Sequence, residues 1–483
     1  MRRPGAVLLV SCYELGRPPQ SVAWALGFLT RAGFAPAVQD LAVESLDTER
    51  VRQARFVAIS VPMHTALRIG MQVARRFREI NEACTICFFG HYAILHAEML
   101  LRPRAGGSPL ADAVLGGEME EKLVELVREG ALSTSSTPEQ PAARDATVAK
   151  PGALVHTTPH DAAAVTRTPP PAAILERLDF ATPSREALPS LDRYAHLVHD
   201  TGHAVAGHVE SSRGCLHHCR HCPIAPIYAG RLFVVPRDTV LEDVRNQVRA
   251  GARHITFGDA DFLNGPAHSL RIAREMHAEF PDLTFDFTAK VEHIRRHRDV
   301  VAELGQLGAL FMVSAVESLN DRVLAILDKG HTQADVYEAL SILRDAHIVM
   351  RPSLLPFTPW STFGDFIELL DFAERENLIE QIDPVQFTIR LLVPHGSVLA
   401  DHPEMKPHRG AFDEEHLSYK WVHPDPRMDA LQSQLSRLVE EATSRGEDPE
   451  VTFYRIRLAA ASTAKAPRRR RQRPPRLTES WFC

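Results

Sequence analysis

The sequence lacks three features that would define its environment. Nothing in its 483 residues approaches the run of about 20 apolar residues that a membrane span requires. Its net charge is only −6, which argues against nucleic acid as the default partner. Its seven cysteines are an odd number for a disulfide framework, and three of them are clustered. We therefore expect a cytoplasmic protein that uses these thiols to bind a metal.

The apolar pattern predicts an α/β protein with two successive alternations of strands and helices. The first alternation has expected strands at residues 6–12, 34–41, 56–62, 84–90 and 111–117. It predicts a parallel, doubly wound sheet of the Rossmann type. The second alternation has expected strands at residues 206–212, 254–260, 283–289, 310–317, 348–357 and 385–394. It predicts a partial (β/α)6 barrel, with its site at the carboxyl ends of the strands.

Composition divides the chain into five segments. We expect the first sheet at residues 1–130 and an Ala-, Ser-, Thr- and Pro-rich linker at residues 131–172. The barrel follows at residues 173–405, and a helical region at residues 406–460. Residues 461–483 are basic and proline-rich. We expect them to be a disordered tail, because such a composition cannot bury a core.

Three cysteines follow the first strand of the predicted barrel. Cys215, Cys219 and Cys222 have the spacing C-x3-C-x2-C. A zinc site would need a fourth ligand, for which histidines at positions 217, 218 and 221 are available. A [4Fe–4S] cluster held by three thiolates would instead leave one iron open to bind a small molecule and pass it an electron. The residues alone keep both alternatives, and the cluster better explains why there are three thiolates.

The cysteine motif resembles the hallmark of the radical S-adenosylmethionine (SAM) superfamily. Residues 254–262 and 313–332 resemble segments of the same family, although Ala315 replaces a usual glycine. The resemblance implies a [4Fe–4S] cluster at the three cysteines and SAM chelated to the fourth iron. It also implies reductive cleavage of a carbon–sulfur bond of SAM, usually with release of a 5′-deoxyadenosyl radical.

The resemblance also implies which side chains bind SAM. Gly258 would let the backbone approach the ligand closely, and Asp259 would accept hydrogen bonds from the SAM ammonium. Glu317 and Ser318 would reach the ribose or the amino-acid part of SAM. The SAM carboxylate has two candidate partners, Lys290 and Arg351.

Residues 6–130 resemble the cobalamin-binding-type domain that precedes many radical SAM barrels. The resemblance lies in residues 88–100 and 117–120. The D-x-H-x-x-G motif, whose histidine ligates cobalt in that family, is absent after the first strand, so cobalamin binding stays open. Cys12 stands at this strand end. It is either a thiol that contacts a substrate or metal, or a small apolar residue of the core.

The last residues, RLTESWFC, resemble the tail of one radical SAM subfamily. Its chains finish with Cys-Cys-Ala-Glu-Pro or Cys-selenocysteine-Ala-Glu-Pro. On this hypothesis a selenocysteine codon follows Cys483, and the vicinal pair binds a thiophilic substrate such as trivalent arsenic. The subfamily includes the arsinothricin-biosynthesis enzyme, which would imply transfer of the 3-amino-3-carboxypropyl group of SAM to arsenic. The alternative is an accidental terminal cysteine.

Several functions therefore stay open. The leading one is a radical SAM enzyme with a small-molecule substrate and an electron donor such as flavodoxin or ferredoxin. Cobalamin-dependent methyl transfer to an unreactive carbon is the second, and a non-catalytic metal- or cluster-binding protein is the third. A methylthiotransferase acting on tRNA fits less well, because that class brings an N-terminal cluster domain with further cysteines, which this sequence does not show.

Overall fold

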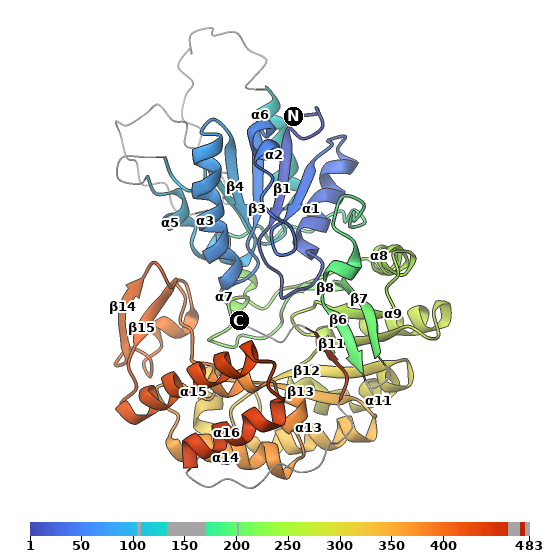
Figure 1. The fold of residues 1–483 in the computed structure, drawn as a ribbon. Helices are drawn as coiled ribbons and strands as arrows, with labels where there is room; N and C mark the ends of the chain where they lie inside the picture. The colour runs from blue at the N-terminus through green and yellow to red at the C-terminus, as the bar shows by residue number, and fades with distance from the viewer. Residues whose placement is uncertain (104–107, 133–170, 200–201, 462–473, 479–483) are drawn as a thin grey trace. The chain divides into compact units, whose positions relative to one another are not determined.

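The computed structural model describes residues 1–103, 108–132, 171–199, 202–461 and 474–478 (Figure 1). The chain divides into two compact units, Met1–Tyr194 and Ala195–Phe482. Most of the predicted linker lies outside the described residues. No helix among the described residues is both long enough and apolar enough to span a bilayer.

The first unit is a parallel sheet with the strand order β2-β1-β3-β4-β5. Its strands are β1 (Val7–Ser11), β2 (Ala37–Asp40), β3 (Phe56–Ser60), β4 (Thr85–Phe89) and β5 (Ala113–Leu115). All five predicted strands are confirmed. Every residue of β1 and β3 is buried, as expected for central strands covered on both faces.

Helices cover both faces of this sheet. They are α1 (Gln20–Arg31), α2 (Thr48–Gln53), α3 (His64–Ile80), α4 (His91–Leu95), α5 (Ala97–Leu101) and α6 (Glu120–Leu132). Helix α1 packs against α6, and α2 packs against α3 (Figure 1). The order of strands reverses direction between β1 and β3, and the crevice at such a reversal is where doubly wound sheets bind ligands.

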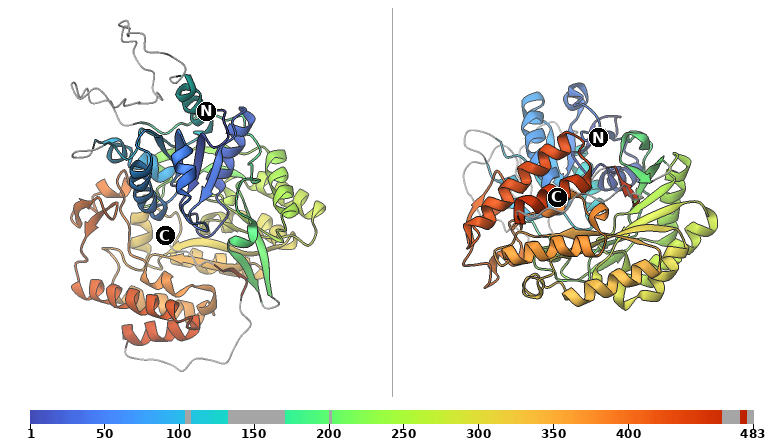
Figure 2. Two further views of the ribbon diagram at one scale, coloured as in Figure 1. Left: turned by 45° about the horizontal axis from the view of Figure 1, so that its top comes forward. Right: turned by 60° about the horizontal axis from the view of Figure 1, so that its bottom comes forward.

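The second unit is a curled half-barrel with the strand order β13-β12-β11-β10-β7-β6-β16. Its parallel strands are β7 (Gly202–Val209), β10 (His254–Phe257), β11 (Thr284–Thr288), β12 (Ala309–Glu317) and β13 (Val349–Leu354). The connecting helices are α8 (Arg237–Arg249), α9 (Pro266–Glu279), α10 (Val291–Arg296), α11 (Arg298–Gln306), α12 (Asp321–Leu327), α13 (Gln333–Asp345) and α14 (Phe363–Arg375). Figure 2 shows helices along one side of this sheet.

The prediction of a strand at residues 385–394 is wrong. Pro384–Thr388 is a 3-10 helix, and Arg390 makes only an isolated parallel bridge with Phe357. The backbone N–H of Leu354, at the end of β13, donates to the side-chain oxygen of Gln386 at 2.9 Å. A side chain therefore satisfies a donor that a neighbouring strand would otherwise have used.

The two faces of the half-barrel sheet differ in polarity. The strand registers place His208, Thr256, Asp286, Val313 and Arg351 on one face. Thr256 Oγ1 donates to Asp286 Oδ1 on this face at 2.6 Å. The opposite face carries aromatic rings that contact one another and Phe262, namely Phe257, Phe285 and Phe287. A polar face opposite an apolar, helix-covered face is suited to binding a polar ligand.

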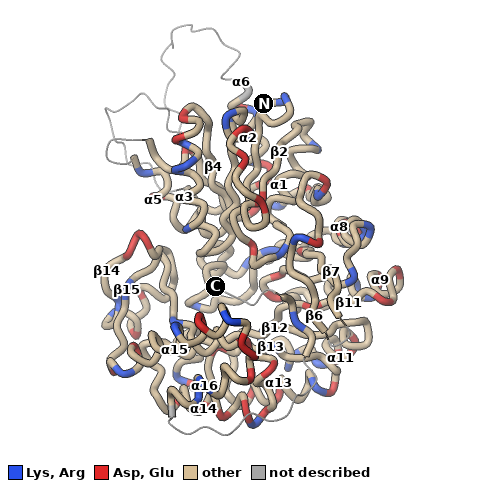
Figure 3. Tube along the Cα trace, in the orientation of Figure 1, with Lys and Arg blue, Asp and Glu red and all other residues tan. Residues whose placement is uncertain are grey.

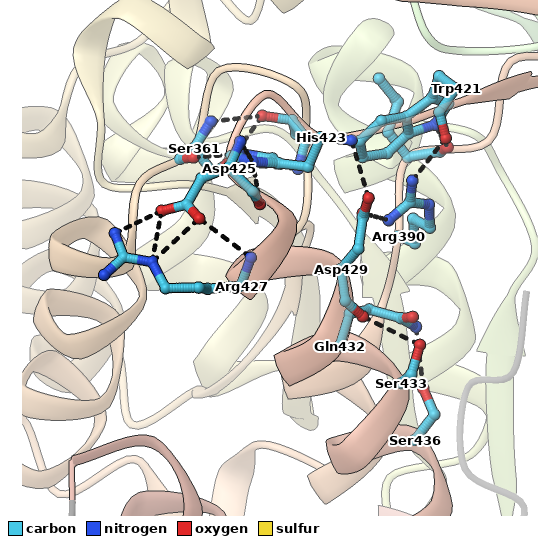
Figure 4. A network of polar contacts seen from close by, with 12 residues as sticks. Ser361, Arg390, Trp421, His423, Asp425, Arg427, Asp429, Gln432, Ser433 and Ser436 are labelled. Carbon is cyan, nitrogen blue, oxygen red and sulfur yellow. Dashed lines mark hydrogen bonds and ion pairs between the residues drawn. The ribbon is translucent and has the colours of Figure 1, made fainter.

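A polar network holds the C-terminal elements to the barrel (Figure 4). The C-terminal elements are β14 (Arg409–Asp413), β15 (Ser418–Trp421), α15 (Pro426–Ser444) and α16 (Pro449–Ala461), and the residues labelled in the network include members of β15 and α15. The guanidinium carbon of Arg390 lies 3.5 Å from the centre of the Trp421 ring, a cation–π contact. Arg390 also donates to the Asp429 carboxylate and to the Trp421 carbonyl. One arginine thereby joins the end of the barrel, the β14–β15 hairpin and α15.

The prediction of a disordered tail is wrong for residues 474–478. Arg476–Leu477 form β16, which pairs antiparallel with β6 (His196–His199) at the edge of the barrel sheet. The Thr478 N–H donates to the His196 carbonyl at 2.7 Å. Residue 461 ends α16, and the rest of the predicted tail, residues 462–473 and 479–483 including Cys483, lies outside the described residues. The longest run of arginines, residues 468–471, also lies there, whereas both signs of charge are interspersed along the described trace (Figure 3).

Gly117→Ala should destabilise the first unit strongly. Gly117 has φ +77°, and a Cβ atom there would lie 2.1 Å from the Ile174 carbonyl oxygen, so the backbone would have to shift. Gly33 is the matched control, because its φ is +80° and nothing lies within 4 Å of its Cβ position. We expect Gly33→Ala to cost about 1 kcal/mol for the left-handed backbone. Gly117→Ala should cost about 2 kcal/mol more, from overpacking. Urea unfolding of the full chain measures both; equal losses would contradict the packing argument.

Candidate functional site

The three cysteines of the motif lie on one loop beyond the carboxyl end of β7. The chain leaves β7, forms the short strand β8 (Ser212–Gly214), which pairs with β9 (Leu232–Val234), and enters the cysteine loop, residues 215–222. Helix α7 (Ala225–Tyr228) follows the loop. Cys219 is buried, and Cys215 and Cys222 are half-buried. The loop therefore stands at the end of the barrel strands where the sequence pattern predicts the site.

The thiols of this loop share a desolvated environment. Burial raises the pKa of Cys222 to about 11, and the nearby Cys219 and Cys215 also raise it. Burial is the main reason that the pKa of Cys215 is raised as well. Three neighbouring thiolates would need a positive partner to offset this cost. Residues 195–482 contain no other cysteine, so the donor set is three soft thiolates, which fits a [4Fe–4S] cluster with one iron left open.

Arg220 anchors the cysteine loop to the end of a helix. Its guanidinium Nη1 donates to the carbonyls of Ala325 (3.0 Å) and Ile326 (2.7 Å), and its backbone N–H donates to the carbonyl of Leu327 (2.9 Å). All three carbonyls belong to the last turn of α12, where helical hydrogen bonding leaves acceptors unused. A positive charge there also complements the helix dipole. One residue between two cysteines thus fixes the loop against the second half of the barrel.

A buried ionic cluster adjoins the loop. Glu317 Oε1 lies 3.2 Å from Lys329 Nζ and 3.2 Å from His221 Nε2. Burial alone would raise the pKa of Glu317, but Lys329 and His221 outweigh it and lower that pKa to about 2. Burial acts to lower the pKa of Lys329, and Glu317 with the nearby Cys219 raises it overall. The lysine is therefore charged and lies close to the thiols.

Gly258 and Asp259, predicted to bind the SAM ammonium, lie directly beyond β10. A Cβ at position 258 would be 2.3 Å from His208 Nε2, so the His208 side chain would have to shift to admit a larger residue. The Asp259 carboxylate accepts hydrogen bonds from the Ser211 N–H (2.9 Å), the Ser211 hydroxyl (2.7 Å) and the Ser212 hydroxyl (2.6 Å). Through these bonds Asp259 holds in place the segment that leads into the cysteine loop. Its contact with SAM stays a prediction.

The other candidate SAM-binding residues lie within or just beyond β11, β12 and β13. Lys290 is buried, with Nζ 3.7 Å from Glu292 Oε2. The Ser318 hydroxyl accepts from the Asn320 N–H at 3.0 Å. Arg351 donates through Nη2 to Asp383 at 2.9 Å, while its buried Nη1 has no hydrogen-bond partner among the described residues. An unpaired buried guanidinium nitrogen on the polar face fits an anionic group such as the SAM carboxylate.

Two of the histidines between the cysteines have partners away from the thiols. His221 contacts Glu317, and His217 Nε2 lies 3.1 Å from His293 Nε2. This arrangement does not favour a zinc site closed by these histidines and the cysteines. Sequence reasoning did not select Lys329, Asp261 or His293. Asp261 lies in the segment after β10, where polar residues beyond a barrel strand are expected to face the site. Lys329 follows α12 and His293 lies in α10, so this rule would not have signalled them.

In the first unit, polar side chains gather where β1 and β3 end. Glu14 accepts from the Gln20 N–H at 2.9 Å and from the Ser60 hydroxyl at 3.4 Å. Cys12 is 3% exposed, and its burial, with the charge of Asp40, raises its pKa to about 12. The thiol is therefore protonated at neutral pH. This favours Cys12 as a core residue over the alternative of a substrate-binding thiol.

The barrel matches a known family. Residues 209–373 match the model of the radical SAM superfamily. The chain is 26% identical over 186 residues to ribosomal protein uS12 methylthiotransferase RimO from Parabacteroides distasonis, which is 35% of this chain and 40% of that protein. It is 24% identical over 236 residues to tRNA-2-methylthio-N(6)-dimethylallyladenosine synthase from Haemophilus influenzae, 45% of this chain and 47% of that protein. The matched stretch spans less than half the length of these relatives.

Solved structures resemble more of the chain. The methyltransferase TsrM from Kitasatospora setae, with tryptophan and a SAM analogue bound, has a TM-score of 0.62 at 15% identity. The match covers 89% of this chain and 88% of TsrM. The cobalamin-dependent SAM radical enzyme OxsB has a TM-score of 0.66 at 14% identity, covering 91% of this chain and 67% of OxsB. The architecture of an N-terminal Rossmann-like unit and a radical SAM half-barrel is confirmed.

Lys329→Met should destabilise the protein more than a double variant that neutralises both members of the Glu317–Lys329 ion pair. It would leave the buried Glu317 carboxylate without its lysine, which typically costs about 3–5 kcal/mol. Glu317→Gln combined with Lys329→Met removes both charges and should cost much less. Urea unfolding of the two single variants and the double variant measures the coupling. Additive losses would show that the two groups do not stabilise each other.

Cys12 should resist alkylation in the native protein at pH 8. A buried thiol whose pKa is raised to about 12 has almost no reactive thiolate at that pH. Iodoacetamide labelling followed by peptide mass spectrometry measures the modified fraction, with urea-unfolded protein as the fully reactive control. Rapid labelling of Cys12 in the folded chain would instead support an accessible substrate thiol.

Proposed function

We propose that the chain is an enzyme that cleaves SAM reductively, and the match of residues 209–373 to the radical SAM superfamily supports this. In this proposal Cys215, Cys219 and Cys222 hold a [4Fe–4S] cluster whose open iron binds SAM. The observation that carries the proposal is the donor set, which is three half-buried or buried thiols on one loop with no fourth cysteine in residues 195–482. When bound, the cluster supplies an electron that breaks a carbon–sulfur bond of SAM.

The surrounding residues support this function by holding the loop and balancing its charge. Arg220 fixes the loop to α12. Lys329 places a positive charge near the thiols, and Glu317 keeps that lysine charged and oriented. Arg351 offers an unpaired donor to an anionic group on the polar face of the sheet. Asp259 orients the segment that enters the loop.

The nature of the transferred group has two candidate answers. The fold similarity to TsrM and OxsB over most of the chain supports cobalamin-dependent methyl transfer, with the corrinoid in the crevice of the first unit. The sequence lacks the D-x-H-x-x-G motif, so the cobalt of a bound corrinoid would not be ligated by that motif's histidine. Transfer of the 3-amino-3-carboxypropyl group to arsenic is the other candidate, and it rests on the resemblance of the tail that ends in Cys483.

The acceptor in either case is proposed to be a small molecule, and the electron donor a flavodoxin or ferredoxin. Methylthio transfer, the activity named for the sequence relatives, is less favoured. The similarity to those relatives is confined to part of this chain. The first unit contains Cys12, Cys84 and Cys87, all buried, and these do not repeat the C-x3-C-x2-C spacing.

Anaerobic turnover of SAM tests the proposal. Cluster-reconstituted protein with dithionite and SAM should form a cleaved nucleoside, identified by chromatography and mass spectrometry. Cys215→Ala, Cys219→Ala and Cys222→Ala should each abolish it and lose iron, whereas Cys84→Ala, a cysteine outside the motif, should keep both. Iron and sulfide in the wild type with no nucleoside product would contradict the proposal.

The identity of the nucleoside separates the two transfer reactions. 5′-Deoxyadenosine would favour the usual cleavage and exclude aminocarboxypropyl transfer as the main reaction. 5′-Methylthioadenosine that increases with arsenite would favour aminocarboxypropyl transfer. Gel filtration after incubation with hydroxocobalamin, followed by visible absorbance, shows independently whether a corrinoid stays bound.

A further inference from the structure

A buried ammonium group lies at the end of α12, next to the cysteine loop. Lys329 follows this helix by two residues, and its N–H donates to the Leu324 carbonyl at 3.0 Å. The last residue of the helix, Leu327, accepts from the Arg220 N–H at 2.9 Å. Arg220 stands between the second and third cysteines of the loop. The loop is therefore fixed against the same helix end that carries Lys329.

Glu317 connects this ammonium group to the loop. One oxygen of its carboxylate, Oε1, lies 3.2 Å from Lys329 Nζ and 3.2 Å from His221 Nε2. His221 directly precedes Cys222, the third cysteine of the loop. Because both nitrogens contact the same oxygen atom, the ammonium group lies close to the part of the loop between its second and third cysteines.

The charges of this ion pair are shielded from solvent. The side chains of Lys329 and Glu317 are 3% and 10% exposed. Burial acts to lower the pKa of Lys329, but Glu317 and the thiols of Cys219 and Cys222 raise it overall. The ammonium group therefore stays charged and interacts with the loop thiols as well as with Glu317. Such an interaction is strong because little water or salt screens it.

Two further cations near the loop also have carboxylate partners. Lys290 Nζ lies 3.7 Å from Glu292 Oε2, and Arg220 Nη2 lies 3.5 Å from Asp328 Oδ2. The side chains of Lys290 and Arg220 are 10% and 28% exposed, compared with 3% for Lys329. Of these three cations, Lys329 is the one whose charge water weakens least.

We propose that Lys329 raises the reduction potential of the cluster held by the three cysteines, and that Glu317 holds the ammonium group in place and limits this effect. This role rests on the proposed function, in which an electron donor reduces the cluster. Reduction adds one electron, and so one negative charge, and the step involves no bond and no proton. Charge near an iron–sulfur cluster is one of the factors that set its potential. A buried positive charge favours the reduced form by Coulomb attraction, and a buried negative charge disfavours it.

The midpoint potential of the reconstituted full chain tests this role. The protein is poised anaerobically at a series of potentials with dithionite and mediator dyes, without SAM, and the reduced cluster is measured by electron paramagnetic resonance. Lys329→Met should shift the midpoint to lower potential, and Glu317→Gln should shift it to higher potential. The variant with both changes should lie between the two single variants. A purely structural role of the ion pair would not produce shifts of opposite sign.

Lys420→Met is the matched control. It removes the same charge from a lysine that also has a carboxylate partner, since Lys420 Nζ lies 2.9 Å from Asp413 Oδ2, but this lysine side chain is 71% exposed. Water and salt screen such a charge, so the variant should keep the wild-type potential. Iron and sulfide analysis shows for every variant that the cluster is loaded before its potential is measured.

Two results would overturn the proposed role of Lys329. Loaded Lys329→Met and Glu317→Gln variants whose potentials equal that of the wild type, or shift in the same direction, would refute it and leave the proposed function standing. A wild type that takes up no iron and sulfide would refute both. If Lys329→Met does not take up iron, the direction of the shift in Glu317→Gln decides.

Discussion

The cysteine loop depends on Arg220 for its position. Three thiols on a loop cannot hold one geometry unless the loop itself is held, and Arg220 binds three carbonyls at the end of α12. Its own carbonyl accepts from the Leu399 N–H at 3.1 Å, beyond the last barrel strand. The loop that follows the first strand is thus fixed to the second half of the barrel.

Charge balance is the second constraint on the site. The thiols are desolvated, and so are Glu317 and Lys329, which lie next to them. A buried ion pair adds little stability by itself, because desolvation offsets the attraction between the charges. The pair instead keeps the positively charged Lys329 beside the cysteine thiols, which bind a metal as thiolate anions. Asp261 and His293 form another buried contact between ionisable side chains, with His293 Nδ1 2.9 Å from Asp261 Oδ2.

The main architecture follows from sequence pattern, because apolar periodicity and strand–helix alternation are local properties. All five strands of the first unit and five of the six expected barrel strands are present. In place of the sixth, Pro384–Thr388 form a 3-10 helix, and the Gln386 side chain accepts a hydrogen bond from the backbone of Leu354, a contact that strand propensity does not encode. The β6–β16 pairing joins residues 280 positions apart, Leu197 with Leu477, so local composition alone indicated disorder.

The spacing of Cys215, Cys219 and Cys222 by itself determined the candidate cluster site, because three ligands within eight residues lie close together whatever the fold. Only the tertiary structure decided what surrounds that loop. Lys329 reaches Glu317 across a helix, and His217 reaches His293 across 76 positions of sequence. These contacts arise because parallel strands bring their carboxyl ends to one edge of the sheet, where residues distant in sequence become neighbours.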